Sequence, residues 1–264
     1  MLGSCEQMSF RDLNLHKDYD SEKEDILKDF YIPILSNSKE YYRMAGYFNS
    51  KTLAYSAKGL KDFIINNGRM KLLCGVELTS ADVDSIMLGE TNPEEILADN
   101  FLNDIDSMED EIRKNHVKVL GWMIANGLLE IKVVVMGLNE SDKGIMHYKV
   151  GINRDFEGNY ISFSGSNNES GAGWNKNLEQ FDVYRSWMTG ENDRIISKID
   201  LFTRTWEGNS DEYRTIDVPT AVKDKLIEIA PDNFEELVFE SDKGSSGRGK
   251  KLELFDNQKD AVDI

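Results

Sequence analysis

Residues 145–168 read IMHYKVGINRDFEGNYISFSGSNN and contain two β-rich runs joined by a short polar turn. The runs cover residues 145–153 and 160–164, and both are rich in β-branched or aromatic residues. The segment between them, residues 154–159, has the Gly and Asn typical of a hairpin turn. The stretch therefore predicts two adjacent antiparallel strands.

Five polar side chains in and after these strands form a set suited to attack on a phosphodiester. Strand alternation would place His147 and Lys149 on one face. Ser166 and Asn168 would share a face at the end of the second strand. A histidine acts as a nucleophile or proton donor near neutral pH, and lysine and asparagine donate hydrogen bonds to phosphate oxygens. Glu179 adds a carboxylate that can orient an imidazole.

Each of these residues also has a purely structural interpretation. His147 could be a half-buried strand residue, and Ser166 and Asn168 could serve the turn that follows the strand. Glu179 could be a charge on a strand surface. Two other histidines allow a comparison: His16 lies in polar surroundings that predict an exposed loop, and His116 lies in a helical pattern that predicts a helix surface.

The pattern as a whole resembles the phospholipase D superfamily. Within it, the pattern is most similar to nuclease domains fused to helicases in bacterial restriction and defence proteins, and the resemblance spans residues 30–206. The matching positions are His147, Lys149, Gly165, Ser166, Asn168 and Glu179. One position departs from the pattern, because the family spacing for the motif aspartate falls on Arg154. Asp155, one residue later, is the candidate for the motif aspartate. Asp155 and Gly165 are also candidates for structural support of the site.

The resemblance implies an α/β fold, a phospholipase D-like mixed sheet flanked by helices, with one catalytic motif per chain. It also implies hydrolysis of a phosphodiester through a phosphohistidine intermediate, without a metal or cofactor. A second histidine must protonate the leaving group, and only His147 matches the motif. We therefore expect a twofold homodimer that contributes two copies of His147 and Lys149 to one shared site.

The flanking sequence predicts alternating strands and helices. Residues 43–48, 70–78 and 129–136 have strand patterns, and a helix over roughly residues 50–66 separates the first two, which argues for a parallel pair. The other predicted helices cover residues 20–37 up to a break at Pro33, residues 107–126, and residues 192–206. These elements complete a nuclease domain over residues 1–210.

The net charge of −17 (31 basic and 48 acidic residues) does not favour attraction to DNA. Residues 81–111 hold eleven Asp or Glu and no Lys or Arg, so the rest of the chain, without those eleven charges, stands at −6. We interpret this segment as the solvated face of helices, with a DNA-mimicking lid as the alternative. No apolar segment or signal pattern predicts a membrane partner, so we expect a cytoplasmic protein. Histidine and cysteine are too sparse and badly spaced for zinc, and Cys74 is expected in the core as a thiol.

The C-terminal part changes in composition. We expect a helical extension over residues 211–240 and a flexible linker over residues 241–251. Residues 252–264 resemble the start of a superfamily 2 helicase, with Gln258 in the position of its adenine-reading glutamine. No Gly-Lys-Ser/Thr phosphate loop follows, so we interpret the chain as a piece of a longer protein that includes a helicase domain.

Three functions remain open at this stage. The first is a DNA endonuclease domain of a helicase-linked restriction or defence enzyme. The second is a phospholipase or phospholipid synthase, although those enzymes usually carry two motifs in one chain. The third is a catalytically degenerate domain that dimerises or docks a helicase onto DNA, which the displaced Asp155 and the acidic charge favour.

Overall fold

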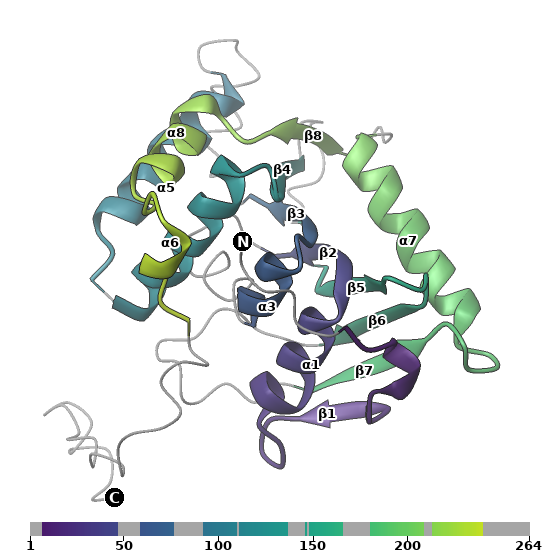
Figure 1. Cartoon of the computed structure of the whole chain (residues 1–264). Coiled ribbons are helices and arrows are strands. Elements are labelled where there is room, and N and C mark those ends of the chain that lie inside the picture. The colour runs from purple at the N-terminus through teal and green to yellow at the C-terminus, as the bar shows by residue number, and fades with distance from the viewer. Residues whose placement is uncertain are drawn as a thin grey trace, which may run out of the picture.

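Eight strands form one mixed sheet in the order β1-β7-β6-β5-β2-β3-β4-β8 (Figure 1). The computed structural model describes residues 7–46, 59–76, 92–109, 111–136, 146, 148–165, 180–208 and 213–239, without the side chains of residues 93, 112 and 113. The strands are β1 (Asp18–Asp20), β2 (Ser38–Ala45), β3 (Arg69–Gly75), β4 (Leu129–Met136), β5 (Val150–Asp155), β6 (Tyr160–Gly165), β7 (Gln180–Arg185) and β8 (Tyr213–Asp217). The helices are η1 (Phe10–Asp12), η2 (Leu27–Tyr31), α1 (Ile32–Ser36), α3 (Leu60–Ile65), α5 (Pro93–Asp106), α6 (Glu111–Ala125), α7 (Asn192–Glu207), α8 (Thr220–Glu228) and η3 (Phe234–Glu236).

The centre of the sheet is parallel. β2 pairs with β3 and β3 pairs with β4, both in parallel register. This confirms the predicted parallel pair, and α3 lies in the connection between its strands. The expected strand over residues 129–136 matches β4 in full. The first part of the predicted helix 50–66 lies outside the described residues.

The other half of the sheet is antiparallel and contains the predicted hairpin. β5 pairs with β2 on one side and with β6 on the other, and β6 then pairs with β7. The Asp155 amide donates to the Asn159 carbonyl at 3.0 Å and closes the turn. Gly158 has a φ of +89°, a conformation that favours glycine. The hairpin prediction is confirmed, as is the fold class of a mixed sheet flanked by helices.

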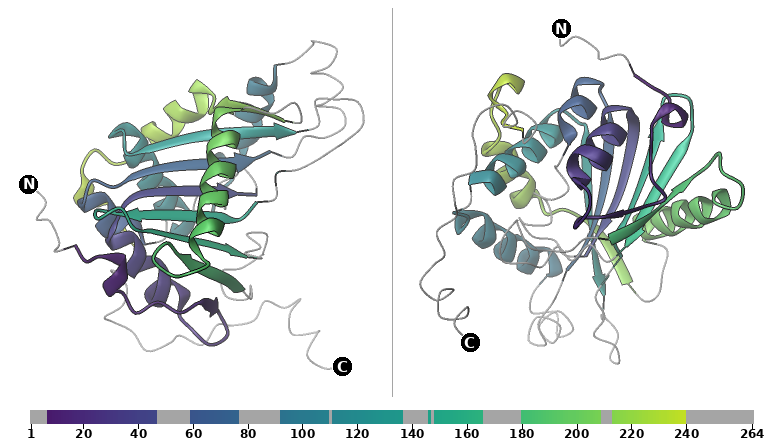
Figure 2. Two further views of the ribbon diagram at one scale, coloured as in Figure 1. Left: turned by 90° about the vertical axis from the view of Figure 1, so that its right-hand side faces the viewer. Right: turned by 90° about the horizontal axis from the view of Figure 1, so that it is seen from below.

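Helices cover both faces of the sheet (Figure 2, left). α7 crosses one face, where Phe202 packs with residues from β2, β3, β4 and β5 in one apolar cluster. The remaining α-helices pack on the opposite face over a larger apolar core. That core includes Cys74, which is buried as expected. The predicted helix 192–206 agrees with α7 within one residue.

Three helical predictions need correction. Pro33 does not end the first helix, because η2 is a π-helix that passes directly into α1, with Pro33 in its first turn. The Asp29 carbonyl, to which proline cannot donate, accepts from the Tyr19 hydroxyl at 3.4 Å. The predicted helix 107–126 starts instead at Glu111, and α5 precedes it as a separate helix. His116 on α6 is 3% exposed rather than a surface residue.

The acidic segment is an amphipathic helix where the structure describes it. In α5, Leu97, Phe101 and Ile105 are buried in the core, and Glu94 and Glu95 face solvent. The solvated-face interpretation therefore holds for α5, since its apolar stripe provides the packing and its carboxylates stay hydrated. Within the described residues, no helix has the length and apolar character needed to cross a membrane.

The region after α7 contributes to the same sheet and core. β8 pairs with the outer side of β4, and α8 packs against α6. The expected helical extension 211–240 therefore contains a strand as well as a helix. The proposed linker 241–251 and the helicase-like residues 252–264 lie outside the described part of the chain.

The contact between α6 and α8 depends on Gly121. A Cβ atom at this position would lie 2.0 Å from the Leu226 carbonyl oxygen. We expect Gly121→Ala to lower the free energy of unfolding by about 2 kcal/mol, because the backbone clash exceeds the roughly 1 kcal/mol gain in helix propensity. Urea denaturation measures the change. Ser197→Ala, at an exposed position of α7, is the control and should change stability by less than about 0.5 kcal/mol. Equal stability of Gly121→Ala and wild type would contradict the packing described here.

Candidate active site

Three strand ends meet at one edge of the sheet. Val150 at the start of β5 pairs with Ser164, and Gly165 at the end of β6 pairs with Phe181 in β7. On the other side, Val150 pairs with Met44 near the C-terminal end of β2. The start of β5, the end of β6 and the start of β7 are therefore neighbours. The C-terminal ends of β2, β3, β4 and β6 all lie on this side of the sheet.

Lys149 lies at this edge, directly before the first residue of β5. It is 9% exposed, whereas its neighbour Tyr148 is 46% exposed. Burying an ammonium group is unfavourable unless polar groups or opposite charges surround it. The buried Lys149 ammonium group therefore needs polar partners within the protein.

The predicted strand over residues 145–153 begins later than expected. β5 starts at Val150, and residues 148 and 149 are not in a strand. Met146 explains the difference, since it is buried against the ends of β2 and β3. A Cβ atom on Gly75 would lie 2.9 Å from the Met146 carbonyl oxygen and 2.4 Å from that of Gly46. The chain therefore crosses the end of β2 before β5 begins. Because Lys149 is not in a strand, the alternation of side chains along a strand does not determine which way it points.

Gly165 brings β6 and β7 into close contact at the same edge. A Cβ atom on Gly165 would lie 2.3 Å from the Gln180 carbonyl oxygen and 2.6 Å from the Phe181 Cα. Any side chain here would push the two strands apart. The close approach of β6 and β7 therefore requires glycine at position 165, independently of any catalytic role.

The other predicted site residues lie outside the described residues: His147, Ser166, Asn168 and Glu179. Their neighbours in the sequence are described. His147 lies between Met146 and Tyr148, Ser166 follows Gly165, and Glu179 precedes Gln180. The described neighbours of His147, Ser166 and Glu179 therefore lie where three adjacent strands begin or end.

Asp155 lies at the opposite end of β5 from Lys149. Its side chain is 1% exposed and accepts hydrogen bonds from the backbone amides of Phe10 at 2.9 Å and Asn159 at 2.7 Å. It also accepts from the Glu157 amide at 3.0 Å and from the Asn159 side chain at 2.8 Å. The carboxylate therefore organises the hairpin and ties η1 to it. β5 separates it from Lys149 by roughly 20 Å, at about 3.3 Å per residue.

Sequence reasoning missed Arg43, a buried charge close to the edge. Its side chain is 1% exposed in the middle of β2, and its guanidinium carbon lies 5.3 Å from the centre of the Phe163 ring. Gly151, which pairs with both Arg43 and Phe163, has no side chain between them. A Cβ atom on Gly151 would lie 2.1 Å from the Phe163 ring. The only signal in the sequence was one charged residue in an otherwise strand-like run.

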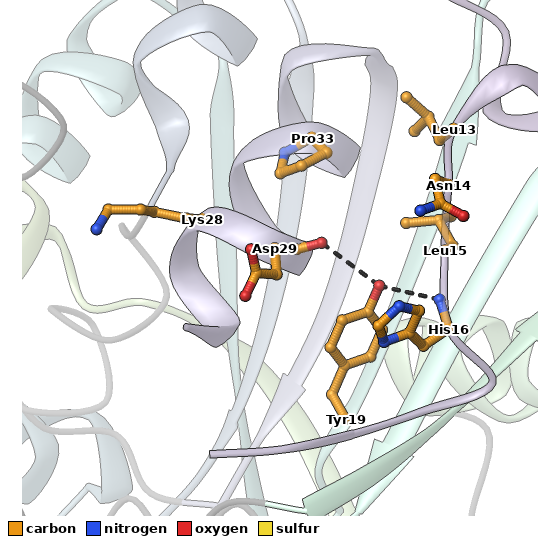
Figure 3. Close-up of a pocket in the computed structure, with 8 residues that line it drawn as sticks. All are labelled: Leu13, Asn14, Leu15, His16, Tyr19, Lys28, Asp29 and Pro33. Carbon is orange, nitrogen blue, oxygen red and sulfur yellow. Dashed lines mark hydrogen bonds between the residues drawn. The ribbon is translucent and has the colours of Figure 1, made fainter. Parts of the chain in front are cut away.

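The residues around His16 form a different surface. His16 is exposed, as expected, and its Nδ1 contacts the Glu24 carboxylate. Its backbone amide donates to the Tyr19 hydroxyl at 3.2 Å. Burial raises the pKa of Tyr19, and this hydrogen bond opposes the rise. His16 and Tyr19 line a pocket of about 330 Å³ beside η2, and the Lys28 side chain, also in its lining, points away from His16 (Figure 3).

No group of three His, Cys, Asp or Glu side chains arranged to hold a metal ion occurs among the described residues.

Comparison with known proteins gives matches at the level of structure only. No protein-family model matches the chain, and no curated protein matches it in sequence. NucT from Helicobacter pylori is 14% identical, with a TM-score of 0.40 over 72% of this chain and 96% of that chain. A phosphatidylserine synthase from Haemophilus influenzae is also 14% identical, with a TM-score of 0.36 over 78% of this chain and 42% of that chain. These values describe a partial likeness in fold and say nothing of activity.

The contacts of Asp155 predict a role in stability. Asp155→Ala should lower the free energy of unfolding by about 3 kcal/mol, because it leaves several buried amide donors without an acceptor. Glu157→Ala, at an exposed position of the same turn, is the control and should cost less than about 1 kcal/mol. Chemical denaturation measures both. A destabilisation of Asp155→Ala no larger than that of Glu157→Ala would contradict this role.

Proposed function

We propose that this chain is a phosphodiesterase domain that cuts DNA through a phosphohistidine intermediate. The observation that supports it best is the convergence of three strand ends at one edge. The buried Lys149 lies there, two residues from His147. Gly165 and Gln180, the sequence neighbours of Ser166 and Glu179, lie beside each other across the β6–β7 pair. Antiparallel pairing brings these strand ends together, so the described sequence neighbours of His147, Ser166 and Glu179 join the sheet at one place.

The proposed reaction has two steps. In the first, an imidazole nitrogen of His147 attacks phosphorus, a P–N bond forms, and the P–O bond to the leaving group breaks. Lys149 and Asn168 hold the phosphoryl oxygens, with a further hydrogen bond from Ser166, and so stabilise the charge that develops on them. Glu179 accepts the other imidazole N–H and fixes the tautomer. In the second step water attacks phosphorus, and the P–N bond breaks.

The leaving alkoxide needs a proton from a second histidine. We propose that it comes from His147 of a second copy of the chain, in a twofold dimer with one shared site. The second imidazole protonates the leaving oxygen and then removes a proton from the attacking water. One shared site cuts one DNA strand at a time, so a double-strand break needs two events.

The net charge of −17 is compatible with a DNA substrate if the acidic residues lie away from the site. α5, which carries the acidic segment's described part, packs against α8 beside the β4 half of the sheet (Figure 1). The candidate site lies in the β5–β7 half. We further propose that the chain belongs to a helicase-linked restriction or defence enzyme, on the basis of residues 252–264.

Nicking of supercoiled plasmid DNA in EDTA tests the assignment. Wild type should convert supercoiled plasmid to the open-circular form, and His147→Ala should be slower by at least about 10³-fold, because the nucleophile is lost. His16→Ala is the matched control: it removes an exposed histidine outside the proposed site and should leave the rate unchanged.

The outcome separates the three functions. If His147→Ala nicks DNA as fast as wild type, the proposed nucleophile is wrong. DNA binding by wild type without cleavage, with ATP and the helicase portion present, would indicate the degenerate docking domain. Release of phosphatidic acid from phospholipid vesicles, without DNA cleavage, would indicate a phospholipase.

A further inference from the structure

Tyr148 lies at the edge that carries the candidate site, directly before Lys149. The two neighbours have opposite surroundings, since Tyr148 is 46% exposed and Lys149 is 9% exposed. Val150, two residues after Tyr148, begins β5 and pairs with Ser164 in β6. The backbones of Tyr148 and Val150 are at most about 7 Å apart, because two residues span no more than that. An aromatic ring is thus exposed to solvent beside the place where β5 and β6 meet.

Tyr148 differs from the other tyrosines in its lack of protein partners. Its ring and hydroxyl have no ring contact and no hydrogen bond with any described residue. Every other tyrosine in the described part of the chain has at least one interaction: Tyr19, Tyr31, Tyr41, Tyr42, Tyr160, Tyr184 and Tyr213. A tyrosine that stabilises a fold buries its ring or pairs its hydroxyl. The described contacts therefore assign no such role to Tyr148.

A single exposed aromatic side chain is ordinary on a protein surface, so its position decides the argument. Phe156 is the other exposed aromatic residue in the described ranges, and at 45% its exposed fraction is almost equal. Phe156 lies in the turn between β5 and β6, at the far end of the hairpin. Tyr148 lies at the opposite end, where β2, β5, β6 and β7 begin or end at the candidate edge. The two rings therefore differ in location and hardly in exposure.

The chemistry of an exposed ring indicates the kind of ligand that it can bind. A phenol ring has a flat apolar face, and nucleic-acid bases of any sequence stack on such faces. Membrane binding scales with the apolar area that is buried, and one ring supplies little. Among the described residues at this edge, Tyr148 is the one large apolar side chain that is exposed. A base therefore fits this position better than a lipid surface does.

We propose that Tyr148 is a substrate-binding residue that stacks on the base next to the phosphate group bound at the candidate edge. This inference rests on the proposed function, since it concerns the same site. The substrate is then a nucleic acid with an accessible base, either a single strand or a duplex in which the base has left its stack. Tyr148 contacts the base and takes no part in the breaking of bonds.

The test is the affinity of the full 264-residue chain for a short, fluorescein-labelled, single-stranded oligothymidylate. Fluorescence anisotropy measures it at one fixed salt concentration. Tyr148→Leu should bind about tenfold more weakly, because it removes the stacking of one base on an aromatic ring. Tyr148→Phe keeps the ring and should stay within about threefold of wild type. Electrophoresis of the same samples shows whether the oligonucleotide remains intact during the measurement.

Two controls separate stacking from other effects. The first is an oligonucleotide of the same length built from abasic residues, which keeps the phosphates and lacks the bases. Wild type and Tyr148→Leu should bind it with affinities within about twofold of each other. The second is Phe156→Leu, which removes a ring of similar exposure at the far end of the hairpin. This variant should bind oligothymidylate within about twofold of wild type.

Four results would overturn the proposal. These are an equal loss of affinity for the abasic ligand in Tyr148→Leu, an equal loss in Phe156→Leu, a loss in Tyr148→Phe as large as in Tyr148→Leu, and no binding of oligothymidylate by wild type. Circular dichroism identifies the folded variants, and failure of both Tyr148→Leu and Tyr148→Ala to fold would assign Tyr148 to stability instead. Weaker binding of Tyr148→Leu to phospholipid vesicles, with unchanged affinity for oligothymidylate, would indicate a lipid surface.

Plasmid nicking tests the proposed function separately. Base-dependent binding through Tyr148 in a chain that cuts no DNA would support this inference alone. Nicking by wild type, together with full oligothymidylate affinity in Tyr148→Leu, would support the proposed function alone.

Discussion

The antiparallel pairing of β5, β6 and β7 is the constraint on which the candidate site depends. Because neighbouring strands run in opposite directions, the start of β5, the end of β6 and the start of β7 must lie at one edge. Segments separated by about thirty residues in the sequence are thereby joined to the sheet side by side. Gly165 permits the close approach of β6 to β7, and the Asp155 carboxylate holds the hairpin at the opposite end.

Local patterns predicted the elements well where local forces decide them. The strand over residues 129–136 is rich in β-branched residues, and the hairpin is fixed by its own turn residues, so both agree with the structure. Contacts between distant segments decide the rest. Met146 packs against the ends of β2 and β3 and delays the start of β5, and neither neighbour is near it in the sequence. Pro33 is accommodated because η2 and Tyr19 arrange the backbone around it.

The chemistry of the candidate site stays a prediction, and its surroundings could be predicted from the sequence only in part. Spacing singled out Lys149 and Gly165, and the structure places both at one edge. Asp155 was chosen for its position in a motif, yet its hydrogen bonds explain it as the organiser of a turn. Arg43 could not be found by spacing, because its partners Gly151 and Phe163 come from two other strands. The neighbours of a buried charged residue can be identified only when the order of the strands in the sheet is known.

The central claim is that residues from these strand ends assemble around one phosphate. A crystal structure of the full chain with bound tungstate, a phosphate mimic, tests it most directly. The account predicts one tungstate per pair of chains on a twofold axis, contacted by Lys149 and by His147 from both copies. Tungstate bound elsewhere, or His147 side chains far apart in the only dimer formed, would contradict it.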